Sequence, residues 1–292
     1  MSTGLKIKLF EGGHCVHPGF VVKPGSGLKP RAFPAAVALI EHPSQGYLLF
    51  DTGYHENFFT VTRTFPERFY AWTTPCKLKH GDGIIEQLQL AGIAPLQINH
   101  LVLSHFHADH IAAVSEFNSA QIHCTQQGLN SIQQSGRING VRKGYLKKLL
   151  PAEITKQLCI HTQFPLAFDQ VINGRGASEG PAIELACADL FNDQSLYLVA
   201  LPGHAAGQIG LLCQLTNRWV FLLADACWLI DSLADEVDQH WLANFLCDDV
   251  AQYRATLAQL RHCYRRYQHL IDFVPSHCSA TINALKAKGW MQ

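Results

Sequence analysis

Three histidines and an aspartate fall within the six residues from His105 to His110. His105 and His107 stand two residues apart, so in an extended chain their rings point to the same side, whereas Asp109 and His110 can face a second point nearby. Imidazole nitrogens and carboxylate oxygens are common ligands of zinc and also suit iron or manganese. A polar loop of hydrogen-bonded histidines is the alternative, but this density of ligand types favours a metal site.

The flanking residues predict the elements that position these side chains. Ile98–Leu103 is an apolar run with β-branched residues, which predicts a buried strand. Ile111–Val114 continues into a predicted helix whose first turn holds Asp109. The histidines therefore lie between a strand end and a helix start, where α/β sheets bind their ligands.

The pattern His-x-His-x-Asp-His after an apolar strand resembles the metal-binding motif of the metallo-β-lactamase fold hydrolases. Four further stretches resemble landmarks of that family in the same order, namely Phe50–Gly53, Pro202–His204, Ala224–Asp225 and Ser276–His277. The resemblance covers most of the chain. It is specific for the fold and the metal site and says little about the substrate.

By this resemblance the chain binds two divalent metal ions, with zinc the first choice and iron or manganese as alternatives. The implied ligands are His105, His107 and His204 for one ion, Asp109, His110 and His277 for the other, and Asp225 as a bridge. Asp51 is expected to accept a hydrogen bond from the outer ring nitrogen of a ligand histidine. Two metals lower the pKa of a shared water from about 15.7 towards neutrality, which supplies hydroxide, and Asp109 is expected to pass a proton to the leaving group.

One position departs from the family pattern. Lactonases of the family carry a tyrosine three residues after the bridging aspartate, aimed at the substrate carbonyl, and here that residue is Trp228. An indole N–H donates a hydrogen bond but cannot titrate as a phenol does. The departure bears on the substrate and not on the metal site.

Other segments are expected to shape the surroundings of the site. Within an aromatic segment at 54–80, six aromatic residues crowd into residues 58–72 without a regular period. The segment is interpreted as a pocket wall, as a homodimer contact or as ordinary packing. In the first case Phe65, Phe69 and Trp72 join Trp228 around an apolar substrate. Residues 135–181 are expected to be an insertion at the substrate entrance, and the glycine-rich residues 11–19 a loop that either lines the pocket or is a solvated turn.

Composition bounds the remaining choices. The chain has 292 residues, of which 48% are hydrophobic and 16% charged, so it can bury a large core. Two β-rich halves with flanking helices predict an α/β fold, a four-layer αβ/βα sandwich formed by a single domain over residues 1–292. The formal net charge is zero, which argues against nucleic acid or an anionic membrane as the main partner. No apolar run resembles a signal peptide or a membrane span, and the ten scattered cysteines form no Cys-x-x-Cys pair, so we expect reduced thiols and a cytoplasmic protein.

These features favour a hydrolase that uses a metal-bridging hydroxide to cleave an ester or lactone of a small, hydrophobic substrate. The alternatives are a thioester hydrolase of the glyoxalase II type, a β-lactamase-like enzyme and a protein that senses a ligand at its metals. A β-lactamase is expected to be exported, and no export signal is present in the sequence.

Overall fold

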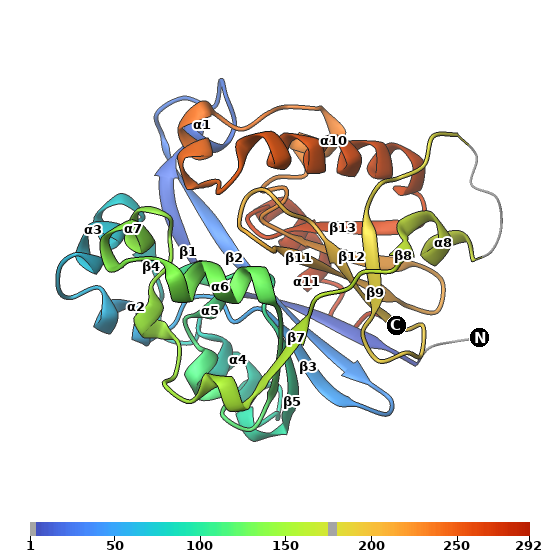
Figure 1. Ribbon diagram of the computed structural model, residues 1–292, viewed down its shortest axis with the longest axis horizontal. Helices are drawn as coiled ribbons and strands as arrows, with labels where there is room; N and C mark the ends of the chain where they lie inside the picture. The colour runs from blue at the N-terminus through green and yellow to red at the C-terminus, as the bar shows by residue number, and fades with distance from the viewer. Residues whose placement is uncertain (1–3, 175–179) are drawn as a thin grey trace.

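Two β-sheets pack face to face, with helices on both outer faces (Figure 1). The computed structural model describes residues 4–174 and 180–292. The arrangement is the αβ/βα sandwich that the sequence predicts.

The first sheet has seven strands, in the order β4-β1-β2-β3-β5-β6-β7. Its strands are β1 (Lys6–Pro18), β2 (Pro30–His42), β3 (Gly46–Phe50), β4 (Cys76–Lys77), β5 (Ile98–Val102), β6 (Gln121–Thr125) and β7 (Leu158–His161). Strands β3, β5, β6 and β7 are parallel to one another, so their carboxyl ends lie along one edge of the sheet.

The second sheet has six strands, in the order β13-β12-β11-β10-β9-β8. Its strands are β8 (Leu166–Ala167), β9 (Ala186–Asp189), β10 (Leu196–Ala200), β11 (Ile209–Gln214), β12 (Trp219–Ala224) and β13 (Ile271–Pro275). Only the β12–β13 pair is parallel. These two strands therefore end side by side.

The helices connect and cover the strands. The α-helices are α1 (Gly19–Val22), α2 (Glu56–Val61), α3 (Glu67–Thr73), α4 (Ile84–Leu90), α5 (Ala108–Ile111), α6 (Gln126–Gln134), α7 (Arg137–Arg142), α8 (Phe168–Asn173), α9 (Asp231–Ala234), α10 (Val250–Tyr267) and α11 (Ser279–Lys286). The 3-10 helices are η1 (Pro95–Gln97), η2 (Val114–Glu116), η3 (Lys147–Leu149), η4 (Ile154–Lys156) and η5 (Trp241–Leu246). The amphipathic pattern from Val250 onward becomes α10, whose residues Leu257 and Leu260 are buried.

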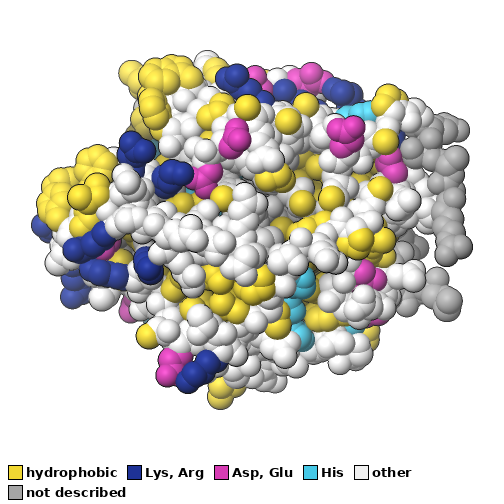
Figure 2. All heavy atoms as spheres, in the orientation of Figure 1, with side chains coloured by type: hydrophobic (Ala, Val, Ile, Leu, Met, Phe, Trp, Pro, Cys, Tyr) yellow, Lys and Arg dark blue, Asp and Glu magenta, His cyan; other side chains and the backbone are white. Residues whose placement is uncertain are grey.

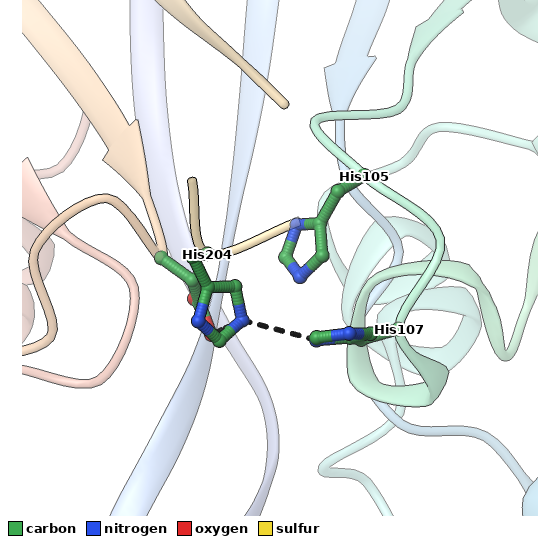
Figure 3. A group of neighbouring side chains, drawn as sticks. His105, His107 and His204 are labelled. Carbon is green, nitrogen blue, oxygen red and sulfur yellow. Dashed lines mark hydrogen bonds and ion pairs between the residues drawn. The ribbon is translucent and has the colours of Figure 1, made fainter. Parts of the chain in front are cut away.

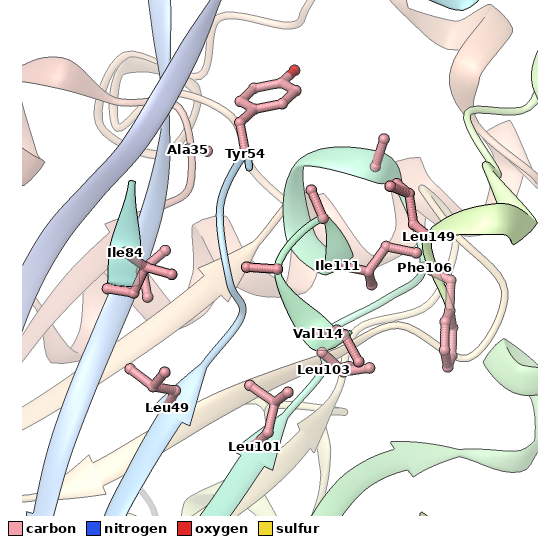
Figure 4. Close-up of a cluster of buried hydrophobic side chains, with 14 of the residues drawn as sticks. Ala35, Leu49, Tyr54, Ile84, Leu101, Leu103, Phe106, Ile111, Val114 and Leu149 are labelled. Carbon is pink, nitrogen blue, oxygen red and sulfur yellow. The ribbon is translucent and has the colours of Figure 1, made fainter. Parts of the chain in front are cut away.

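Three apolar layers hold the sandwich together. Between the sheets, Val102 on one side and Leu222 on the other belong to a single buried cluster. A second cluster lies outside the seven-stranded sheet and includes Leu101 and Ile111 (Figure 4), and a third packs α10 on the six-stranded sheet. Strands buried on both faces explain the continuous apolar runs in the sequence.

The glycine-rich residues 11–19 do not form the expected loop. Strand β1 continues through them to Pro18, with an irregularity in its pairing between Glu11 and His14. A Cβ atom on Gly12 would stand only 2.7 Å from the Gly53 Cα, so glycine lets the strand pass close to the turn after β3. The glycines therefore serve close packing rather than a turn.

Residues 135–181 contribute to both sheets as well as to the surface. They supply α7, η3 and η4, the edge strands β7 and β8, and α8, where Phe168 is fully buried. Residues 175–179 of this stretch lie outside the described residues. That the whole chain is one domain stays a prediction.

Two further expectations concern the state of the cysteines and the absence of a membrane span. All ten cysteines are free in the structure, and that their thiols are reduced stays a prediction. In the part of the chain that the structure describes, no helix is both long enough and apolar enough to cross a membrane.

Candidate metal centre

The seven predicted ligands come together at the strand ends of both sheets, and all are buried. Each follows or begins an element: His105 follows β5, His107 to His110 form the start of α5, His204 follows β10, Asp225 follows β12 and His277 follows β13. The ligands that follow β5, β12 and β13 converge, so residues far apart in sequence become neighbours.

The ligand atoms fall into two groups, each within 4.8 Å. The first contains His105, His107, His204 and Asp225, and Figure 3 shows its three imidazoles turned toward one another. The second contains Asp109, His110 and His277. Asp225 Oδ2 lies 3.3 Å from His204 Nε2 and 3.1 Å from His277 Nε2, so its carboxylate reaches both groups.

The donor atoms fit divalent metal ions. His105, His107 and His110 each have a buried Nε2 atom without a hydrogen bond, and so does Asp225 at Oδ1. Leaving buried polar atoms unpaired costs about 1–3 kcal/mol each. Metal coordination removes this cost, and imidazole with carboxylate is the donor set that zinc and similar ions accept.

Three histidines are oriented through their outer ring nitrogens. His110 Nδ1 lies 2.8 Å from Asp51 Oδ2, which is the contact predicted for that aspartate. His277 Nδ1 donates to the Pro34 carbonyl oxygen at 2.7 Å, and His105 Nδ1 lies 3.0 Å from Ser104 Oγ. With Nδ1 engaged, each ring presents Nε2 to the centre, as in metal sites with fixed histidines.

Residues that the sequence analysis did not single out support the remaining two histidines. Cys247 Sγ lies 3.9 Å from His204 Nδ1, and the ring of Tyr145 lies 5.2 Å from that of His107. The Tyr145 hydroxyl donates to Asp248 at 2.6 Å, and Asp248 also accepts from the Ala206 amide. No motif marks these positions, because they reach the site from two separate loops, one between α7 and η3 and one between η5 and α10.

Electrostatics favour neutral nitrogen ligands in the first group. Burial lowers the pKa of His204 to about 3 and that of His105 well below its usual range, with neighbouring imidazoles adding to the effect at His105. Burial opposes ionisation of Asp225, but the charges of His277 and His110 outweigh it and hold the pKa of that carboxyl well below its ordinary value. In the first group, neutral imidazoles beside an ionised carboxylate are the protonation states that metal binding requires. In the second group, burial lowers the pKa values of His110 and His277, but the Asp109 and Asp225 carboxylates outweigh it and raise the pKa of His277 to about 9 and that of His110 well above its ordinary value, so these rings must release a proton when a metal binds.

The backbone beside two ligands is constrained. Ala224, which precedes Asp225, has a φ of 49°, a conformation that costs a non-glycine residue about 1–3 kcal/mol. Gly203, which precedes His204, has a φ of 125°, and a Cβ there would meet the Tyr253 amide nitrogen at 2.1 Å. Strain and close packing at these turns fix where the two ligands point.

A cleft leads to the ligands between α3 and η5. Besides His107, Asp109, His204, Asp225 and His277, it is lined by Cys15, His17, Phe33, Tyr54, Tyr70, Thr74, Trp228 and Leu246. Of the two histidines in residues 11–19, His17 lines the cleft. His14 does not, and its Nδ1 lies 3.7 Å from Glu11 Oε1. A larger cavity of about 710 Å³ lies between α2 and α4 and contains none of the seven ligands.

The predicted pocket residues divide into two kinds. Trp228 lines the cleft. Phe65, Phe69 and Trp72 are exposed and none of them lines the cleft, so their contact with a substrate stays a prediction. On helix α3 it is Tyr70 that faces the cleft. The aromatic residues at 58–72 follow no regular helical period, so the sequence did not show which of them face inward.

The Trp228 indole is already engaged. Its Nε1 donates to Asp225 Oδ2 at 3.1 Å. The ring lies 5.8 Å from His204 and 5.9 Å from His277, measured between centroids. Trp228 therefore contacts the carboxylate that joins the two groups and forms one wall of the cleft.

Fold, ligand cluster and sequence comparison agree on the class of this protein. Residues 30–125 match the family model of the Metallo-beta-lactamase superfamily. This match, together with the relatives and solved structures below, supports a lactonase-like member of the superfamily.

Individual relatives are lactonases. The chain is 26% identical to the N-acyl homoserine lactonase AttM of Rhizobium radiobacter over 267 residues, which cover 87% of this chain and 86% of that protein. It is 25% identical to the N-acyl homoserine lactonase AiiB of Agrobacterium fabrum, with 73% of each covered. A solved N-acyl homoserine lactone hydrolase with N-hexanoyl-L-homoserine at its catalytic metal centre has the same fold, with a TM-score of 0.70, 18% identity and 97% of each chain covered.

Proposed function

We propose that this protein hydrolyses lactones or related esters of small, hydrophobic substrates with two divalent metal ions. The observation that carries the proposal is the convergence of buried ligand atoms, several of which have no hydrogen bond. Zinc is the first choice, because imidazole and carboxylate suit it and because the structural neighbour AidC is a dizinc lactonase, with a TM-score of 0.62 and 13% identity. Iron and manganese accept the same donors.

The proposed ligands divide as the geometry divides them. His105, His107 and His204 would hold one ion and Asp109, His110 and His277 the other, and the Asp225 carboxylate, which lies near both groups, could serve both. When bound, such ions supply a hydroxide nucleophile near neutral pH and withdraw charge from the substrate carbonyl. The remaining tasks fall to the side chains of the chain itself.

We propose that Asp109 moves a proton during the reaction. Its Oδ2 lies 3.6 Å from the Nε2 atoms of both His110 and His277, and the residue also lines the cleft where the substrate enters. A carboxylate in this position can carry a proton to the leaving alkoxide oxygen when the ester bond breaks. We assign this role to Asp109.

The cleft favours a substrate with an apolar body. Phe33, Tyr54, Tyr70 and Leu246 line it beside the ligands. Burying apolar surface there stabilises the complex by about 25 cal/mol per Å². Since the Trp228 N–H is bonded to Asp225, we propose that this residue holds the shared carboxylate and shapes the wall rather than binding the substrate carbonyl.

A panel of substrates tests the proposal. The metal-loaded protein is assayed on N-acyl homoserine lactones, simple lactones, aryl esters, a thioester and a β-lactam. We expect turnover of lactones or esters that a chelator abolishes and zinc restores. Turnover of only the thioester or the β-lactam contradicts the substrate class, and ligand binding without any turnover contradicts the enzyme and favours a sensor.

A further inference from the structure

Exposed aromatic side chains stand on both sides of the cleft mouth. On α3 and the turn before it, Phe65, Phe69 and Trp72 are 56%, 52% and 62% exposed, and we call this group the α3 ridge. On η5, Trp241 and Phe245 are 61% and 71% exposed, and we call them the η5 ridge. Figure 2 shows apolar patches at the places where Figure 1 has α3 and α1, the helix that contacts η5.

Each ridge is the outer face of an element whose inner face lines the cleft. Tyr70 of α3 and Leu246 of η5 both border the cleft. The outward rings contact one another within each ridge, with centroids 5.3 Å apart for Phe65 and Trp72 and 5.8 Å apart for Trp241 and Phe245. Exposed apolar patches of this kind mark interaction surfaces.

The surface around the α3 ridge is basic although the whole chain is neutral. Helix α3 contacts α7, and α2 contacts η3, so residues 56–74 and 135–150 form one surface. These two stretches carry seven basic residues, Arg63, Arg68, Arg137, Arg142, Lys143, Lys147 and Lys148, and two acidic ones, Glu56 and Glu67. Glu67 is already paired with Arg137 and Lys148, and Lys143 is paired with Asp248. Arg68 lies 6.0 Å from the ring centroid of Trp72.

We propose that the two ridges dock this protein on an anionic lipid bilayer, with the cleft mouth turned toward the membrane. At the α3 ridge, aromatic rings lie beside lysine and arginine, which is the composition of surfaces that enter the lipid interface, where the rings leave water and the cations meet anionic headgroups. The η5 ridge adds two rings but no cations, because residues 231–249 contain acidic residues and no lysine or arginine. A two-fold dimer through the α3 ridge is disfavoured, because it would place the basic stretches of two copies against each other. The proposal revises the expectation of no membrane partner, which rested on net charge averaged over the chain.

Docking also supplies a route for the substrate, and only this part rests on the proposed function. An apolar substrate dissolved in the bilayer would meet the cleft between Tyr70 and Leu246 without crossing water. Lipid binding itself needs no turnover. Its test therefore fails or succeeds independently of the hydrolase assignment.

Vesicle co-sedimentation of the full chain tests the proposal. We expect binding to phosphatidylcholine vesicles that contain about a third phosphatidylglycerol, weak binding to pure phosphatidylcholine, and release by high salt. The double variant Phe69→Ser with Trp72→Ser should bind roughly tenfold more weakly or worse, and so should Trp241→Ser with Phe245→Ser. The matched control is Leu90→Ser with Leu96→Ser, since these leucines are 85% and 71% exposed and lie on α4 and η1, neither of which lines the cleft.

The outcomes distinguish a lipid bilayer from a second copy of the chain as the partner of the two ridges. Circular dichroism and thermal melting establish that each variant is folded, and intrinsic fluorescence should shift to shorter wavelength when Trp72 and Trp241 enter the interface. Failure of the wild type to bind anionic vesicles overturns the proposal, as does an equal loss in the leucine control. A wild-type dimer that the Phe69→Ser and Trp72→Ser changes dissociate, without vesicle binding, assigns the surface to a second copy instead.

Discussion

Two clusters of buried or half-buried histidines lie in this molecule, and they differ in how their nitrogens are used. In one, His100, His123 and His161 stand on the adjacent strands β5, β6 and β7. Their rings form a row, with 3.0 Å between His100 Nδ1 and His123 Nε2 and 3.1 Å between His123 Nδ1 and His161 Nε2. In the candidate metal centre, the nitrogens instead converge on common points.

The difference shows what distinguishes a metal site from a packed histidine cluster. In the row, the nitrogens that face a neighbouring ring are paired with it, and no carboxylate is among the three residues. In the metal centre, His204 Nε2 also pairs with His107 Nδ1 at 3.0 Å (Figure 3), but three Nε2 atoms lack hydrogen bonds and two carboxylates lie among the rings. We therefore expect the same substitution to have different consequences in the two places.

The largest difference is expected from removing single rings. His107→Ala, His204→Ala and Asp225→Ala should each lower kcat/KM by about 10³-fold or more and reduce bound metal, because they remove ligand atoms. His123→Ala in the row should leave metal content unchanged and turnover within about threefold, since it contacts none of the ligands. Elemental analysis and kinetics on the same preparations check both statements.

A thiol beside the site provides a second comparison for these variants. Cys278 follows His277 but is buried away from the ligand groups, next to Thr281. Cys278→Ser should largely spare both activity and metal content. Loss of activity in this variant at full metal content would show that the site has been assigned to the wrong residues.

A smaller effect is expected from the aspartate behind His110. Asp51→Asn removes the charge that accepts from His110 Nδ1 and should weaken metal affinity by about 10–100-fold. Asp169→Asn is the matched control, because Asp169 is also a buried carboxylate but bonds Tyr267 on α10. It should lower thermal stability without changing the affinity measured by metal titration, and equal affinity losses in both variants would argue against a specific role of Asp51.

The inward face of α3 gives a third contrast. Tyr70→Leu should raise KM for substrates with long apolar tails by about 3–10-fold, and much less for short ones, because the ring lines the cleft. Leu90→Ala, an exposed apolar residue on α4, should change neither value. Equal KM changes for long and short substrates would show that Tyr70 does not contact the tail.

The smallest expected effect is on the pH dependence of stability. Burial, with help from His161 and His100, lowers the pKa of His123 from 6.5 to about 3. The unfolded chain therefore takes up a proton as pH falls from 6.5 towards 3 and the folded chain does not, so stability is lost across that window. In His123→Gln the free energy of unfolding should fall less steeply between pH 6.5 and 5, as urea titrations can measure, and identical slopes would contradict the buried neutral ring.

The sequence was sufficient for the fold class and for bringing the ligands together, because both depend on local patterns. Apolar runs that predict strands lead up to His105, Asp225 and His277. These residues are therefore expected at strand ends, where α/β folds gather their ligands. The residues around the metal site were harder to predict from the sequence. Phe69 and Tyr70 are adjacent aromatics, yet one faces solvent and the other the cleft, which depends on what packs against α3.

Some supporting contacts could not be anticipated for a related reason. Cys247 and Tyr145 approach His204 and His107 from loops whose course depends on tertiary packing. The hydrogen bond from Trp228 to Asp225 likewise needs a particular turn after β12, including the left-handed Ala224. Each is a side-chain contact that no residue spacing encodes.

The central claim is that the converging atoms hold two metal ions. The most direct measurement is elemental analysis of the protein after expression in metal-replete medium, with His105→Ala and His110→Ala alongside, one from each ligand group. We predict about two divalent ions per wild-type chain and about one fewer in each variant. Wild-type protein that is folded but contains no metal, or metal content that neither variant lowers, would contradict the account.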